Sequence, residues 1–174
     1  MITPQEFLIE LEMEAATTRK MLEKIPDDKF GWKPHKKSMD IKTLSTHLAD
    51  LAGWPDLILR TEQLDFENMG DYEYPDLNNR AEVLAYFEKQ LAVSKAALAK
   101  ASVADLVPNW TLRSGETIYD VSPKGKVVRM AFSQTVHHRA QLGVFLRLLD
   151  IPIPGSYGPS ADEMEMEAKA ATAG

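Results

Sequence analysis

Two histidines inside helical patterns are the residues of this chain best suited to chemistry. His47 and His138 each lie at or beside an apolar stripe that repeats every three or four residues, the period of an amphipathic helix. Gln134 precedes His138 by one helical turn, so the two side chains share a face. Three ligands with positions left open for water or substrate are typical of catalytic metal sites. The spacing is therefore compatible with a divalent-metal site at His47, Gln134 and His138.

The same three side chains are also consistent with a metal-free network. Buried polar groups cost free energy unless they form hydrogen bonds, and histidines beside apolar faces are common. A neutral amide oxygen is also a poorer ligand for zinc or nickel than an imidazole nitrogen, which bears on Gln134. Spacing alone favours the hydrogen-bonded network, and both interpretations stay open.

Three further polar residues flank these positions. Asp50, near His47, and Gln141, near His138, are predicted to hold the imidazole tautomers by hydrogen bonds. His137 points roughly a quarter turn away from His138, so we expect it to pack or hydrogen-bond beside the site. No Ser-His-Asp order, glycine-rich phosphate loop or Glu-x-x-His motif is present in the sequence, and no catalytic residue is assigned.

Four long helices are predicted to position these side chains. Their expected ranges are about 4–25, 41–62, 80–100 and 126–149. Thr3 and Glu6 form a capping box at the start of the first helix, and Pro55 is expected to kink the second helix or to mark a break in it. We therefore predict an all-α fold, a four-helix bundle, with a short β-hairpin between the third and fourth helices, within 101–125.

Length and composition limit the domain organisation and the class of function. The 174 residues are enough for one domain, predicted over 1–163, followed by an Ala- and Glu-rich tail, 164–174, that is loosely ordered. A net charge of −6 disfavours nucleic-acid binding. The absence of cysteine from the sequence excludes disulfides, thiolate catalysis and Cys-based zinc sites. Without an apolar run of membrane-spanning length or a signal peptide, we expect a cytoplasmic protein with no membrane partner.

Three segments of the sequence resemble the DinB family of damage-inducible helical proteins. Leu44-Ser-Thr-His-Leu-Ala-Asp50, preceded by Trp32-Lys-Pro34, resembles the histidine segment of the family's second helix. His137-His-Arg-Ala-Gln141 resembles its His-His-Arg-Gly-Gln signature, and Pro154-Gly-Ser-Tyr-Gly-Pro-Ser-Ala-Asp-Glu163 resembles the segment that often follows. The resemblance spans about residues 3–163.

The resemblance implies a four-helix bundle, commonly a homodimer, with a divalent metal held by three histidines. Those positions correspond to His47, Gln134 and His138, so this chain departs from the family at one ligand in three. Ala140 also replaces a usual glycine, a change that a helix tolerates. The resemblance strengthens the expectation of zinc or nickel at His47 and His138, with Gln134 as a weak oxygen ligand or a holder of water.

The family includes thiol-dependent S-transferases, so the resemblance also implies a type of reaction. Our first hypothesis is a metal-dependent transferase of the thiol type, or a hydrolase, acting on a small-molecule substrate. A chain without cysteine would need its thiol from a small-molecule cosubstrate. The alternatives are a metal-free stress-response binding protein that retains the bundle, and a dimeric scaffold without chemistry in its interior.

Overall fold

The computed structural model describes residues 2–70 and 74–172 of the chain. Within them there are six α-helices, two short 3-10 helices and three strands. In chain order these elements are α1 (Pro4–Leu22), η1 (Asp27–Lys29), α2 (Ile41–Leu51), α3 (Trp54–Arg60), β1 (Gln63–Asp65), α4 (Arg80–Lys100), η2 (Val103–Leu106), β2 (Asn109–Ser114), β3 (Thr117–Pro123), α5 (Lys124–Leu148) and α6 (Ala161–Thr172).

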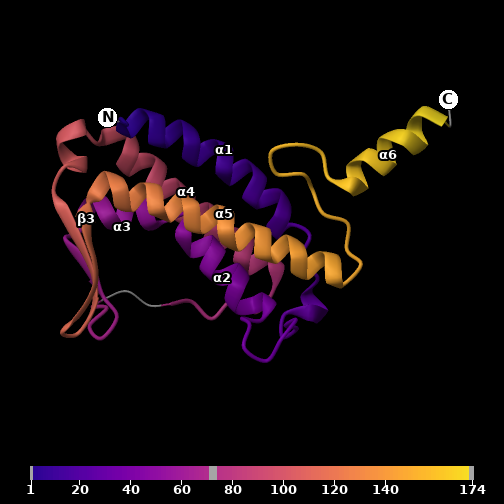
Figure 1. Ribbon diagram of the computed structural model, residues 1–174, viewed down its shortest axis with the longest axis horizontal. Helices are drawn as coiled ribbons and strands as arrows, with labels where there is room; N and C mark the ends of the chain where they lie inside the picture. Colours follow the sequence, from indigo (N-terminus) through magenta and orange to yellow (C-terminus); the bar gives the residue numbers. More distant parts are fainter. Residues whose placement is uncertain (1, 71–73, 173–174) are drawn as a thin grey trace.

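The helices α1, α2, α4 and α5 pack against one another and enclose the hydrophobic core (Figure 1). The predicted capping box starts α1: the Thr3 hydroxyl accepts from the Glu6 backbone N–H (3.2 Å), and the Glu6 carboxylate accepts from the Thr3 N–H (2.7 Å). Side chains at helical spacing then point into the core. The buried apolar residues of α1 and α4 are Phe7, Leu11, Ala15, Met21, Leu22, Val83, Phe87, Leu91 and Leu98.

The predicted second helix is two helices, and the break has a local cause. α2 ends at Leu51 and α3 begins at Trp54. Pro55 has no N–H to donate to the carbonyl of Leu51, and its ring would clash with that carbonyl in a continuous helix. The proline is instead accommodated in the first turn of α3, where no such hydrogen bond is needed. The other predicted helix ends differ from the observed ones by no more than about three residues, except at the tail.

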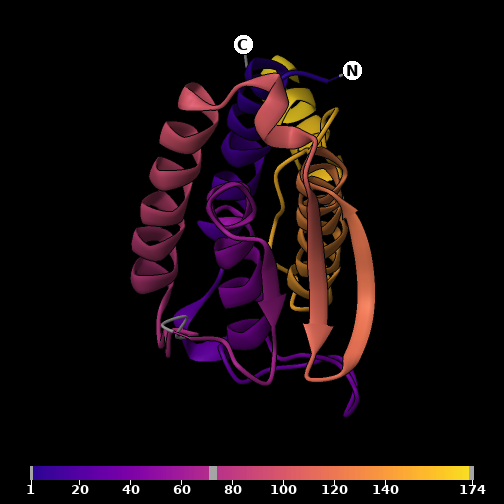
Figure 2. The ribbon, with the colours of Figure 1, turned by 90° about the vertical axis from the view of Figure 1, so that its left-hand side faces the viewer.

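The mostly helical fold is confirmed, but the chain is not all-α, because it also forms a three-stranded sheet at one end of the helices (Figure 2). The expected hairpin is present as β2 and β3, which pair antiparallel through a turn in which Gly115 has a φ of 55°. Its neighbour β1 was not predicted and pairs with β2 in parallel. A three-residue strand with one buried side chain, Leu64, has no period to detect, so its pairing is set by a segment distant in sequence.

The C-terminal tail forms a helix, α6, which points away from the other helices (Figure 1). It begins at Ala161, before the predicted domain boundary at 163, and residues 173–174 of the predicted tail lie outside the described residues. The domain bounds themselves stay a prediction. In the described part of the chain, no helix combines the length and the apolar character that crossing a membrane requires.

Candidate functional site

His47 and His138 meet where α2 packs against α5. Their ring centroids lie 4.6 Å apart, with the ring planes at 83° to each other. His138 is buried, with 9% of its surface exposed, and His47 is half-buried. The structure therefore brings together two of the three side chains that the sequence predicted to converge.

The surroundings of both imidazoles favour their neutral form. Burial lowers the pKa of His47, His138 lowers it further, and the Asp50 carboxylate opposes the change. Burial also lowers the pKa of His138, which the hydrogen bond to Gln141 partly offsets. A neutral imidazole has one nitrogen with a free lone pair, the form that binds a metal or accepts a proton.

Gln141 connects the two adjacent histidines of α5. Its Oε1 lies 3.1 Å from Nδ1 of His138, and its Nε2 lies 3.0 Å from Nε2 of His137. An amide oxygen can only accept and an amide nitrogen can only donate, so His138 carries its proton on Nδ1. The lone pair of His138 is then on Nε2. His137 is exposed and its ring centroid lies 4.8 Å from that of His138, in agreement with a place beside the pair.

Gln134 lies one turn before His138 on α5 and is half-buried. Within residues 2–70 and 74–172, its side chain is in no side-chain hydrogen bond. In the same residues, no group of three or more His, Asp and Glu side chains is arranged to hold a metal ion. A metal at this place would therefore depend on the Gln134 amide as the third ligand, which the structure leaves as a prediction.

Asp50 is directed towards α3 and α4. Its carboxylate accepts hydrogen bonds from the Trp54 indole N–H (3.0 Å) and from the Tyr86 hydroxyl (2.8 Å), and Gln90 Nε2 donates to that hydroxyl (2.5 Å). Burial, followed by the Asp50 charge, raises the pKa of Tyr86. The i,i+4 spacing could have revealed Trp54, whereas Tyr86 comes from another helix and has no signal in the sequence. The predicted role of Asp50 towards the His47 tautomer stays a prediction.

A buried hydroxyl group and a cavity lie next to these residues. The Thr46 hydroxyl, adjacent to His47, is buried and has no hydrogen-bond partner among the described residues. Tyr86 and Gln90 also line a cavity of about 920 Å³ between α3, β1, α4 and the segment that leads to α4. Neither histidine of the pair lines this cavity, whereas Tyr86, which donates a hydrogen bond to Asp50, does.

A second polar cluster lies where α5 faces α1. Arg139 is only 1% exposed, and its guanidinium donates to the Glu14 carboxylate (2.6 Å), the Glu14 carbonyl (3.2 Å) and the Thr18 hydroxyl (3.1 Å). It also donates to the Tyr157 hydroxyl (2.8 Å), which in turn donates to Glu14 (2.8 Å). This burial of Arg139 was not predicted from the sequence.

Comparison with known proteins agrees with the helical architecture. The family model described as DinB family matches residues 1–171. An uncharacterised protein of Bacillus subtilis, YrdA, is 25% identical over 165 residues, which are 92% of each chain. A solved DinB-like protein from Bacillus cereus has a TM-score of 0.66 at 19% identity, over 88% of this chain and 97% of that one.

A solved mycothiol-dependent maleylpyruvate isomerase has a similar fold at greater distance. The TM-score is 0.58 and the identity is 15%, with 82% of this chain matched and 64% of the isomerase. At this identity the likeness is one of fold.

Proposed function

The chain belongs to the DinB family, and we propose that it is a metal-dependent enzyme of the thiol-transferase or hydrolase type. The observation that carries the proposal is the contact of two imidazoles, a half-buried His47 and a buried His138, with ring centroids 4.6 Å apart and surroundings that lower both pKa values. Two histidines brought together from different helices, with Nε2 of His138 unprotonated, supply the nitrogen ligands that zinc and nickel prefer.

The residues present fit a divalent metal held by two imidazoles and one amide oxygen. His47 and His138 would be the stronger ligands, and Gln134 a weak oxygen ligand or the holder of a bound water. Gln141 would support the site by keeping the His138 proton on Nδ1, 3.1 Å from its Oε1. When bound, the metal would act as a Lewis acid that lowers the pKa of a water or thiol in its open position.

A thiol cosubstrate is supported by two observations of different kinds. The sequence has no cysteine, so a thiol at this site would come from a small molecule. The isomerase of similar fold is described as mycothiol-dependent.

A metal-free binding protein of the stress-response type is the second candidate, and a specific observation favours it. No group of three or more His, Asp and Glu side chains is placed to bind a metal in the described part of the chain. In this case His47, His138 and Gln141 form a hydrogen-bonded network inside a retained helical fold, and the function of the protein lies in binding.

Elemental analysis of untagged protein distinguishes the metal-dependent enzyme from the metal-free binding protein. After loading with zinc or nickel and removal of excess metal, the wild type should retain close to one metal per chain, and His138→Ala should retain none. His35→Ala is the matched control, because His35 is exposed in a loop and should not affect the metal content. A wild type that retains no metal after loading would overturn the metal-dependent function.

Gln134→His tests the third ligand directly. Restoring an imidazole at this position should tighten zinc binding by about tenfold or more, because imidazole nitrogen is a much stronger ligand than a neutral amide oxygen. Isothermal titration of metal-free protein gives the affinity. An unchanged affinity would mean that residue 134 does not face the metal, and the ligand set proposed here would be wrong.

A further inference from the structure

An apolar cavity of about 370 Å³ lies at the end of the molecule where α1 and α5 begin (Figure 1). Its apolar lining comes from segments far apart in the sequence: Ile2, Phe7, Leu106, Val107 and Pro123. Phe7 and Leu106 are buried and form its floor, whereas Ile2 and Val107 are 45% and 58% exposed and lie at its rim. A hollow of this size and lining is typical of sites that bind small apolar molecules.

The first two turns of α5 add positive charge to this apolar cavity. Lys126 and Arg129 border it, and none of its described lining residues is acidic. Arg129 forms an ion pair with Glu10, and its guanidinium carbon lies 5.1 Å from the centroid of the Phe132 ring, so its charge is compensated. Lys126 donates to the neutral Ser122 hydroxyl (3.1 Å) and is in no ion pair within residues 2–70 and 74–172. Lys126 is therefore the cation that can accept an anion here.

The backbone at the start of α5 adds charge of the same sign. Gly125 also lines the cavity and has no side chain that could cover the backbone there. In the described structure the N-cap residue, Pro123, makes no side-chain hydrogen bond to the first turn, and that turn contains no acidic residue. The N–H groups at the start of a helix carry partial positive charge. An anion beside Lys126 would therefore also be stabilised by the positive end of the helix.

We propose that this cavity binds a free medium-chain fatty acid, with its hydrocarbon chain against Phe7 and Leu106 and its carboxylate at Lys126. The apolar floor favours the burial of methylene groups, which supplies affinity. The cation at the rim selects a ligand with one negative head group. A small, fully hydrated anion such as phosphate would not use the apolar floor, and a neutral hydrocarbon would not use the lysine.

The cavity is separate from the histidine pair. Lys126 and His138 lie on the same helix, and the twelve residues between these positions correspond to about 18 Å along its axis. Neither His47 nor His138 lines the cavity. The fatty-acid site is thus a second binding site, and it goes beyond the proposed metal-dependent function.

Isothermal titration of the full chain with octanoate, in a metal chelator and below the concentration at which micelles form, tests the site. One octanoate should bind per chain. Each methylene added in the series from hexanoate to octanoate should tighten binding about fourfold, the factor that corresponds to the burial of one methylene group. No binding, or an affinity that does not rise with chain length, overturns the proposal. His138→Ala should bind octanoate as the wild type does, and a loss of binding in this variant would place the ligand at the histidine pair and overturn the proposal.

A charge placed at the rim tests the location. Val107→Glu should weaken octanoate binding about tenfold or more, because it removes an apolar contact and brings a like charge close to the carboxylate. Val144→Glu is the matched control, since Val144 is also 58% exposed but lies near the other end of α5. It should leave the affinity unchanged. Equal affinities in the two variants would show that octanoate binds elsewhere.

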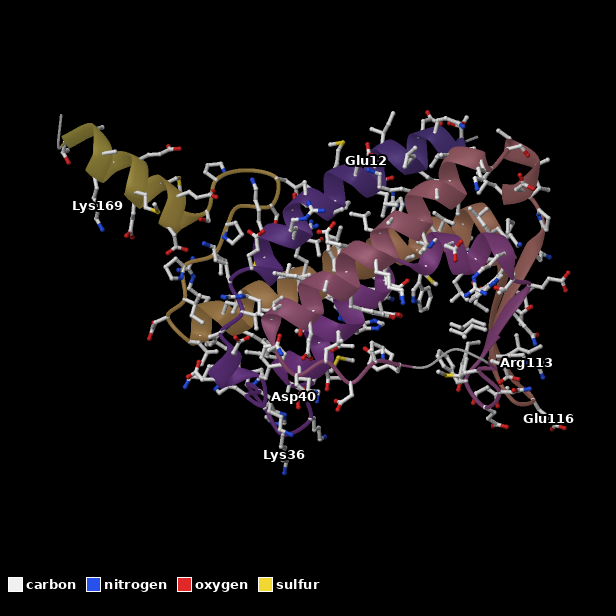
Figure 3. All side chains as sticks on the ribbon, turned by 180° about the vertical axis from the view of Figure 1, so that it is seen from behind. Glu12, Lys36, Asp40, Arg113, Glu116 and Lys169 are labelled. Carbon is white, nitrogen blue, oxygen red and sulfur yellow. The ribbon has the colours of Figure 1, made fainter. Side chains whose placement is uncertain are left out.

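The role of Lys126 is tested by comparing octanoate with 1-octanol, which has a chain of the same length and no charge. Lys126→Gln should weaken octanoate binding about tenfold, the effect of losing one charge-assisted hydrogen bond, and should leave 1-octanol binding unchanged. Lys36→Gln is the control, because Lys36 is exposed and points into solvent from a loop (Figure 3). If Lys126→Gln had no effect on octanoate, or weakened both ligands equally, the assignment of the carboxylate to Lys126 would be wrong.

Discussion

His138 and Arg139 are neighbours in the sequence, but they enter two polar clusters of opposite character. The Arg139 guanidinium is surrounded by the Glu14 carboxylate and carbonyl, the Thr18 hydroxyl and the Tyr157 hydroxyl. Its charge is compensated and its N–H groups have acceptors. His138 contacts His47 and one oxygen of Gln141, and this leaves an imidazole lone pair directed away from Gln141.

The difference shows how one helix serves two purposes. A buried charge that is fully paired holds elements together, here α1, α5 and the segment that carries Tyr157. A buried imidazole with an unused lone pair contributes less to stability and retains the capacity to bind or accept a proton. Substitutions around Arg139 should therefore lower the stability of the fold, whereas substitutions around His138 should weaken metal binding.

The largest expected effect is the loss of stability when Arg139 is substituted. Arg139→Ala should lower the free energy of unfolding by about 3–5 kcal/mol, because it leaves the Glu14 carboxylate without its partner in a mostly buried place. Urea denaturation measures this. The control is Arg147→Ala, which breaks the more exposed pair with Asp162 and should cost no more than about 1 kcal/mol. Equal losses in the two variants would contradict a special role for the buried cluster.

A smaller effect is expected at the hydrogen bond that supports His138. Gln141→Ala should weaken zinc binding by about 10–100-fold, the usual consequence of removing a group that orients a metal-bound histidine. His137→Ala, which removes the other partner of the Gln141 amide, should have a smaller effect because His138 keeps its acceptor. Titration with zinc measures both affinities. If His137→Ala were the more damaging change, the tautomer argument for Gln141 would fail.

The smallest expected effect is on the pH dependence of stability. The pKa values of His47 and His138 are lower in the folded chain than the ordinary 6.5, so the unfolded chain binds more protons at mildly acidic pH. Their contribution to stability is fully present above about pH 6.5 and is lost as the pH falls through the folded-state values. The Asp50 carboxylate opposes the shift at His47.

This dependence is measured by urea denaturation in a metal chelator at about pH 7.5 and about pH 5. A variant with both His47→Gln and His138→Gln should lose less stability on acidification than the wild type. His35→Gln, in an exposed loop, should behave like the wild type. A double variant that loses as much stability as the wild type would show that the pair is not the source of the dependence.

Much of the helical fold could be predicted because its signals are local. The capping box of Thr3 and Glu6, the period of the apolar residues and the hairpin turn at Gly115 each act over a few residues. Pro55 predicted a kink or a break in the second helix, and the structure has the break, between α2 and α3. The strand β1 has no local signal, and its existence depends on pairing with β2.

For the site, the sequence determined the types and the helical faces of His47, Gln134 and His138, and it determined that no cysteine competes for the role of ligand. The tertiary structure decided what each polar side chain meets. It brought the two histidines into contact, directed Asp50 to Trp54 and Tyr86, and buried Arg139 against Glu14. The physical reason is that a helix specifies a side chain's direction through its period, whereas a hydrogen-bond partner on another helix depends on how the helices pack.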